Sequence, residues 1–153
     1  MAKSYVDKLK SKAFAIAKLE VEMTDNYQGK VFAITQKDGN EALCAVNVPT
    51  KDMTNLNFIK DIIETKEIIN NFIQNILNDD MEIKGIVHTE CMKREDVFCV
   101  SFIKVKMIKT ENGYRAAPQE DLEHYAINYG ETSVNEKGEM VKTKSKLVKY
   151  EFE

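Results

Sequence analysis

Three lysines near the end of the chain alternate with smaller residues. Lys142, Lys144 and Lys146 stand two positions apart, so in a strand their side chains project from one face at a spacing of about 7 Å. Ammonium groups in such a row can follow the phosphates of a nucleic acid, and Tyr150, on the same parity, offers a ring for base stacking. The same pattern also protects an exposed edge strand from aggregation. The row therefore indicates either a binding or a protective role.

A second strand-like run combines lysines with aromatic residues. Within residues 98–110, Lys104 and Lys106 share a parity with Phe98 and Phe102, a pattern typical of proteins that bind single-stranded nucleic acid. The aliphatic parts of these lysines would equally well cover the edge of a core. We expect one strand whose first half is buried and whose second half is exposed to water.

Residues that often carry catalysis or hold metals are not spaced for either task. His88 and Cys91 are three positions apart in a predicted strand and so lie on opposite faces, and Cys99 and His124 add no spacing typical of zinc sites. No motif orients a histidine beside a cysteine nucleophile. We therefore expect no enzymatic activity, no metal site and no cofactor.

The middle of the chain is acidic and suggests a different function. Residues 61–100 carry nine acidic and four basic side chains, whereas the whole chain has a net charge of −3. Five of the acidic residues fall on or directly after a predicted helix. This surface suits a basic host protein, as in a phage-type inhibitor of a host defence complex, and it also fits the solvated side of a helix.

Hydrophobic periodicity predicts the elements that position these residues. Apolar residues recur every three or four positions between Thr54 and Asn78, which predicts one long amphipathic helix. Asp38-Gly39 predicts a tight hairpin turn, and Pro118 is expected to end the strand that follows residue 113. Strands are predicted at 13–24, 30–36, 42–48, 81–92, 98–109 and 140–152.

These elements predict a single α+β domain spanning 1–153. An antiparallel sheet in two meander-like halves would pack on one long central helix. The order of strand, turn and proline in 13–80 recurs loosely in 81–153, so a pseudo-repeat is one interpretation.

Composition is typical of a soluble cytoplasmic protein. The chain is 43% hydrophobic and 31% charged, and it contains neither an apolar run of about 18 residues that would span a membrane nor a signal peptide at its lysine-rich start. The three cysteines are expected to be reduced thiols. The strong preference for lysine over arginine suggests a bacterial or phage protein from an AT-rich genome.

Several strand segments resemble a known family. FCVSFIKV at 98–105, GYRAAP at 113–118 and ALCAVNVPTK at 42–51 resemble the strand signatures of the stage V sporulation protein G (SpoVG) family, roughly F-V-V-x-x-I-R-V and G-L-F-V-x-M-P-S-K. The resemblance covers about half of the chain. It implies a small sheet-plus-helix fold, dimerisation and non-enzymatic binding of DNA or RNA. Lys51 fills the basic position after the first proline, whereas the acidic segment 119–121 departs from the pattern after the second.

We therefore predict a non-enzymatic, homodimeric binding protein that carries recognition on the outer rim of its sheet, without polar side chains converging on an internal hollow. Nucleic acid is the first candidate ligand, and a basic host protein is the alternative. The residues assigned to nucleic-acid binding are Lys51, Lys104, Lys106, Lys142, Lys144, Lys146 and Tyr150. The residues assigned to the protein-binding alternative are Asp61, Glu64, Glu67, Asp79 and Asp80.

Overall fold

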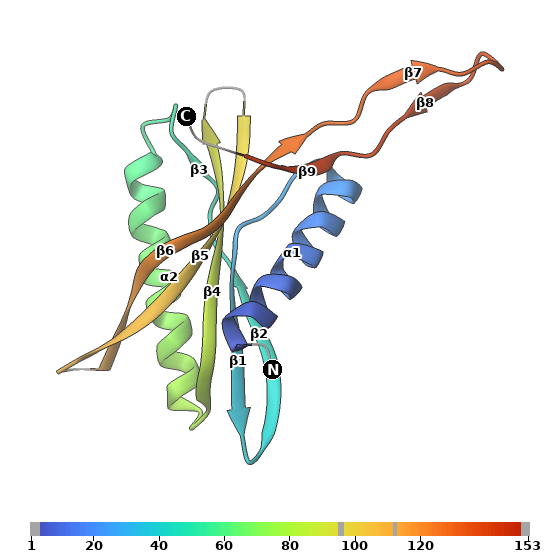
Figure 1. The fold of residues 1–153 in the computed structure, drawn as a ribbon. Coiled ribbons are helices and arrows are strands. Elements are labelled where there is room, and N and C mark those ends of the chain that lie inside the picture. The colour runs from blue at the N-terminus through green and yellow to red at the C-terminus, as the bar shows by residue number, and fades with distance from the viewer. Residues whose placement is uncertain (1–3, 95–96, 112, 151–153) are drawn as a thin grey trace.

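The fold has three layers, with a curled and mostly antiparallel sheet between two helices (Figure 1). The computed structural model describes residues 4–94, 97–111 and 113–150, with the backbone alone at 118–122. The elements are, in chain order, α1 (Tyr5–Thr24), β1 (Lys30–Lys37), β2 (Asn40–Asn47), β3 (Lys51–Asp52), α2 (Phe58–Asn78), β4 (Glu82–Arg94), β5 (Val97–Thr110), β6 (Gly113–Asn128), β7 (Thr132–Val134), β8 (Met140–Lys142) and β9 (Lys146–Lys149). The predicted α+β class with an antiparallel sheet is confirmed. The sheet packs against two helices, however, and not against one central helix.

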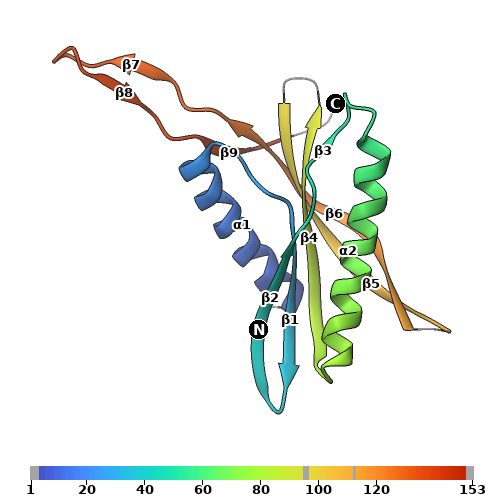
Figure 2. The ribbon, with the colours of Figure 1, turned by 180° about the vertical axis from the view of Figure 1, so that it is seen from behind.

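The main sheet forks in its middle. Its strands follow the order β2-β1-β4-β5-β6-β9, and β3 pairs in parallel with β4. β4 and β5 pair from Val87↔Lys104 to Arg94↔Val97. Beyond that point β4 continues beside β1 and β5 continues beside β6, so the far ends of β5 and β6 swing away from β4 (Figure 1). β7 and β8 form a separate hairpin that projects from the body (Figure 2).

Strand β1 shows why the sheet has a helix on each face. Its central residues 31–35 are all buried, as expected for a strand covered on both sides. Val31 and Ala33 belong to the core cluster that α2 covers. Phe32 and Ile34, on the opposite parity, belong to the cluster that α1 covers. The parity of a residue in the central strands therefore decides which helix it faces.

Helix α1 replaces the strand predicted at 13–24. Its buried residues Leu9, Ala13, Ala17 and Val21 recur every four positions, which is the spacing of one helix face. The Ser4 hydroxyl oxygen accepts a hydrogen bond from the backbone N–H of Asp7 at 3.1 Å and caps the helix. The alternation of Leu19, Val21 and Met23 with charged residues suggested a strand. The residues before 13 continue the helical spacing, however, and the segment is rich in good helix formers.

Helix α2 and the first hairpin were predicted from local signals. The helix begins at Phe58, four residues after the start of the predicted range 54–78, and Asn57 occupies its N-cap position. The turn at Asp38-Gly39 is confirmed, with φ angles of 54° and 80°, the left-handed conformation of a two-residue type I′ turn. No helix in the described ranges has both the length and the apolar character needed to cross a bilayer.

The C-terminal strands differ from the prediction in two ways. β6 continues through Pro118, which pairs with Val105 beside a shift in register. Such irregularities are where a strand tolerates proline. The single strand expected at 140–152 is divided, because β8 pairs with β7 and β9 pairs with β6; residues 151–152 lie outside the described part. The pseudo-repeat stays a prediction: helices occur in 13–80, whereas the described elements of 81–153 are strands.

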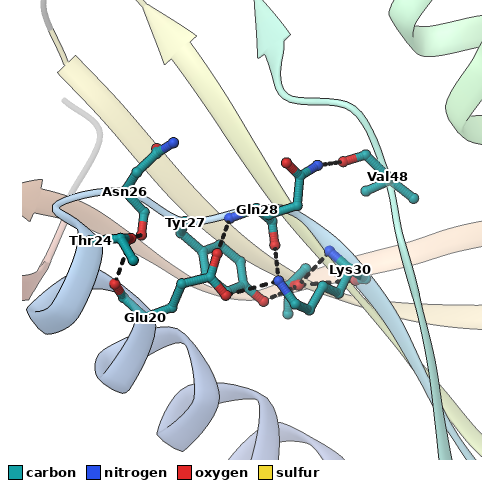
Figure 3. A network of polar contacts seen from close by, with 8 residues as sticks. Glu20, Thr24, Asn26, Tyr27, Gln28, Lys30 and Val48 are labelled. Carbon is teal, nitrogen blue, oxygen red and sulfur yellow. Dashed lines mark hydrogen bonds and ion pairs between the residues drawn. The ribbon is translucent and has the colours of Figure 1, made fainter.

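A polar network fixes the connection between α1 and β1 (Figure 3). The Glu20 carboxylate accepts hydrogen bonds from the Gln28 backbone N–H at 2.7 Å and from the Lys30 ammonium group at 2.9 Å. The Thr24 hydroxyl donates to the Glu20 carbonyl oxygen at 2.7 Å. The Gln28 side-chain amide donates to the Val48 carbonyl oxygen. These bonds hold the end of α1 against the start of β1, so we assign them a structural role.

Candidate functional site

A cleft of about 380 Å³ lies between α2 and the sheet. Alternate residues of β4 and β5 form its floor, because His88 and Glu90 share the parity of Ile86, which faces α2. Its volume falls within the range of about 300–1,000 Å³ typical of small-molecule sites. The polar residues that line it include Lys51, Lys66, Asn70, His88, Glu90 and Arg115.

Lys51 and Glu90 form a buried ion pair in this cleft. Lys51 is 6% exposed and Glu90 is 9% exposed. The parallel pairing of Lys51 with Met92 brings the ammonium group to the carboxylate of Glu90. Lys51, predicted to contact nucleic acid, therefore has its charge inside the protein and matched by a carboxylate.

His88 is buried in the cleft, and its burial does not help to stabilise the fold. Its side chain is 6% exposed, and its Nε2 atom has no hydrogen-bond partner among the described residues. Burial lowers the pKa of His88 from 6.5 to about 3, with a further contribution from the Lys51 ammonium group. The ring is therefore neutral near pH 7, with one nitrogen that donates and one that accepts. A buried polar atom without a partner destabilises a fold.

Two exposed cations line the cleft from opposite walls. Lys66 comes from α2 and Arg115 from β6, and no ion pair to either is found within the described part of the chain. Asn70, one turn after Lys66, accepts a hydrogen bond from the backbone N–H of Ala116 at 3.0 Å and so ties the two walls together. With Lys51 and Glu90, the lining contains three positive and one negative side chain.

Lys104 and Lys106 lie elsewhere, where β4 and β5 separate. They line an open hollow of about 370 Å³ together with Lys84. Lys104 is half-buried and Lys106 exposed, whereas Phe102, on the same parity, is 0% exposed. β5 is therefore a strand that leaves the core and becomes exposed, as predicted. The fork in the sheet adds Lys84 to these two lysines, which the sequence pattern did not predict.

The lysines near the C-terminus do not share one strand face. Lys142 ends β8 and its ammonium group lies 3.0 Å from an Asp25 carboxylate oxygen. Lys144 lies in the segment between β8 and β9, and Lys146 begins β9. Tyr150 follows β9, and its backbone N–H donates to the His124 carbonyl oxygen at 2.8 Å. Because β8 and β9 belong to different sheets, the prediction that these lysines form a continuous row on one strand is wrong.

The predicted acidic residues follow α2 along its length. Asp61, Glu64 and Glu67 lie in its first half, and Asp79 and Asp80 follow its last residue. Asp79 follows Asp61 by 18 positions along the helix, a rise of about 27 Å. The five acidic side chains therefore form two separate groups, Asp61, Glu64 and Glu67 in the first and Asp79 and Asp80 in the second.

Three large apolar residues next to the first acidic group are exposed. Leu56 is 99% exposed, Ile59 68% and Ile63 54%. The helical periodicity at 54–78 suggested that such residues are buried, but Ile59 and Ile63 lie outside the buried face formed by Thr65, Ile69, Ile73 and Ile76. We call Leu56, Ile59 and Ile63 the α2 patch.

The cysteines and histidines of the described ranges form no metal cluster. No group of three or more His, Cys, Asp or Glu side chains there is suited to hold a metal ion. Cys44, Cys91 and Cys99 are free thiols. Burial raises the pKa of Cys91 to about 12, so this sulfur is not a thiolate near neutral pH.

The cleft was missed at the level of sequence because its residues come from β3, α2, β4, β5 and β6. The expectation that no polar side chains converge on a hollow is wrong here, because the buried Lys51, His88 and Glu90 all line the cleft. In the sequence, His88 was considered as a metal ligand and as the base of a cysteine nucleophile, but not as part of a binding cleft. The one local signal was the presence of His88 and Glu90 on the same parity in the middle of the strand predicted at 81–92. No protein-family model, curated protein or solved structure matches this chain, so the assignment of function depends on the geometry alone.

Proposed function

We propose that this chain is a non-enzymatic binding protein that recognises a partner protein through the outer side of α2. The observation that carries the proposal is the exposure of the α2 patch. Single apolar residues are common on protein surfaces, but a group of large ones typically marks an interaction site. Ile59 and Ile63 are one turn apart on the same side of the helix, and Leu56 stands directly before its N-cap residue.

Charge identifies the class of partner. The segment 58–80 carries five acidic and two basic residues, a net charge of −3. Successive helical residues are about 100° apart around the axis, so Glu67 lies only about 40° from Ile63. Apolar anchors beside carboxylates suit a protein that presents an apolar pocket surrounded by lysine or arginine. The phosphates of a nucleic acid would be repelled by the same surface.

The groups in the cleft support a non-enzymatic role. Lys51 and Glu90 neutralise each other. His88, with a pKa of about 3, is a weak general base near neutral pH, because an effective base has a pKa close to the working pH.

Capture experiments with matched variants test the proposal. The full chain, immobilised, is offered a bacterial lysate alongside the variant Ile59→Glu/Ile63→Glu and the control Leu19→Glu/Met23→Glu, which alters exposed residues of α1. We expect a basic protein that the wild type and the control retain, that the α2 variant loses, and that binds the purified chain directly. The proposal is wrong if the α2 variant retains every protein that the wild type binds.

Nucleic-acid binding is the second candidate, favoured by the three lysines at the fork of the sheet. Lys84, Lys104 and Lys106 line one open hollow, although the half-buried Lys84 also forms an ion pair with the exposed Glu82 at 3.0 Å. This is the function that the resemblance to the SpoVG family implies. A strand of nucleic acid in this hollow would contact ammonium groups from two neighbouring strands.

Gel-shift titrations against single- and double-stranded DNA and RNA at two salt concentrations test this candidate. Binding should weaken steeply with salt, and Lys104→Gln/Lys106→Gln should lower the slope of log affinity against log salt by about 2. The variant Lys142→Gln/Lys144→Gln should leave that slope unchanged. A loss confined to the second variant would contradict binding at the fork.

A further inference from the structure

We propose that the cleft between α2 and the sheet binds a small organic anion with an apolar body, such as an aromatic or medium-chain carboxylate. This inference is independent of the α2 patch. It depends on three features of the cleft: its partly enclosed volume of about 380 Å³, the Nε2 atom of His88, which has no hydrogen-bond partner in the described part of the chain, and the excess of positive charge among the lining residues.

The unpaired nitrogen indicates a polar ligand. His88 is 6% exposed, and its ring lies in the floor of the cleft. A hydrophobic residue of similar size would fill the same position without leaving a buried polar atom unsatisfied. A ligand with an oxygen within hydrogen-bonding distance of Nε2 would satisfy that atom, with the tautomer that carries the proton on Nε2 as the donor.

Charge determines the sign of the ligand. Lys51 is already paired with Glu90, so Lys66 and Arg115 supply the two positive charges that remain. Both are exposed and line the cleft from opposite walls, which lets them approach a carboxylate from two sides. Arg115 can form two parallel hydrogen bonds with one carboxylate group.

The remaining lining determines the body of the ligand. Ile62 and Ile69 of α2 face Ile103 and Val105 of β5 across the cleft. Apolar walls with a few polar groups are typical of sites for small organic molecules. A purely inorganic anion would leave these walls without contacts, so the fit is better for an organic anion with an apolar part.

By contrast, in the hollow between α1 and β5–β6, charged and polar lining residues pair with one another. It measures about 320 Å³, and its Lys10 and Glu123 form an ion pair at 2.7 Å. The Tyr125 hydroxyl donates a hydrogen bond to the same carboxylate. The Lys10, Glu123 and Tyr125 side chains are therefore paired with one another, unlike Nε2 of His88.

The test is an NMR titration of the full-length protein with octanoate, phenylacetate and 2-naphthoate, each compared with its uncharged amide. The imidazole resonances of His88 report on the cleft directly. We expect at least one carboxylate to shift them saturably with a Kd on the order of 1 mM or lower, as small ligands of this size allow. The corresponding amide should bind about tenfold or more weakly, since it lacks the charge-assisted contacts.

Two variants complete the test. Arg115→Gln removes one exposed charge and should weaken binding of the carboxylate about tenfold. Lys104→Gln, at the fork, should leave this affinity unchanged. Amides that bind as tightly as carboxylates overturn the inference, as does an unchanged affinity in Arg115→Gln. The absence of any saturable shift of His88 with all three carboxylates also overturns it. Arg115→Gln should still retain the partner of the α2 patch, so failure of the two proposals can be distinguished.

Discussion

The burial of His88 predicts a specific loss of stability in mild acid. In the unfolded chain the imidazole binds a proton below its ordinary pKa of 6.5, whereas in the fold it stays neutral down to a pKa of about 3. Between these two values the unfolded state binds more protons, so the free energy of unfolding decreases as the pH falls. The loss begins near pH 6.5 and is complete near pH 3.

The size of this loss follows from the two pKa values. Each pH unit below 6.5 removes about 1.4 kcal/mol, which gives a loss of about 2 kcal/mol at about pH 5 relative to about pH 7.5. The variant His88→Leu removes the titrating group and keeps an apolar side chain in its place. It should lose about 2 kcal/mol less than the wild type over this interval.

Urea unfolding followed by circular dichroism at both pH values measures the difference. Lys51, Glu90, Lys66 and Arg115, the other charged groups of the cleft, are present in both proteins, so the comparison isolates the contribution of His88. At neutral pH the variant should also be more stable by about 1–2 kcal/mol, since it removes an unsatisfied buried polar atom. If both proteins lose the same free energy between the two pH values, the assignment of His88 as a buried neutral base is wrong.

Three further predictions concern other parts of the fold. Lys51→Met should reduce the free energy of unfolding by about 3–5 kcal/mol because Glu90 is left buried and unpaired. Lys51→Met/Glu90→Met should recover most of that loss in the same urea experiment. Equal losses in both variants would contradict the buried ion pair. Tyr27→Phe removes a buried hydrogen bond of 2.6 Å to the Thr89 hydroxyl and should lower the free energy of unfolding by about 1–2 kcal/mol. Tyr5→Phe removes an exposed bond to Glu41 and should lower it by under about 0.5 kcal/mol in thermal or chemical unfolding. Similar losses would argue against the burial of the Tyr27 hydroxyl. β2 is an edge strand with one charged residue, Glu41, so its unpaired backbone groups can pair with a second copy of the chain. We expect light scattering to show a homodimer that Leu43→Lys converts to a monomer. A monomeric wild type, or a dimeric variant, would rule out β2 as the dimer contact.

Local signals account for the elements that the sequence predicted well. Asp38-Gly39 between apolar runs defines a turn that only residues tolerant of positive φ can form. The apolar positions of α2 repeat over many turns, which few other structures explain. By contrast, residues 13–24 have apolar side chains at both strand and helix spacings. Only Leu9, outside that window, extends the buried series to Ala13, Ala17 and Val21 and identifies the helix.

The candidate sites depended on tertiary structure that no local pattern contains. The cleft combines side chains from five elements. The fork brings Lys84 beside Lys104 and Lys106 because β4 and β5 stop pairing at Val87↔Lys104. The prediction of one row of C-terminal lysines failed because the two ends of the alternating segment pair with different strands, β8 with β7 and β9 with β6. Periodicity indicates which face a residue occupies, but it does not indicate where a strand changes partner.

The most direct test of recognition through α2 is the affinity of the purified partner for the wild type and for Ile59→Glu/Ile63→Glu, measured by calorimetry. Two apolar anchors contribute about 1.5–3 kcal/mol each when buried, so the variant should bind more than about 100-fold more weakly. The control Leu19→Glu/Met23→Glu should bind like the wild type. A decrease of less than about threefold in the α2 variant would contradict the proposal that this helix carries the recognition surface.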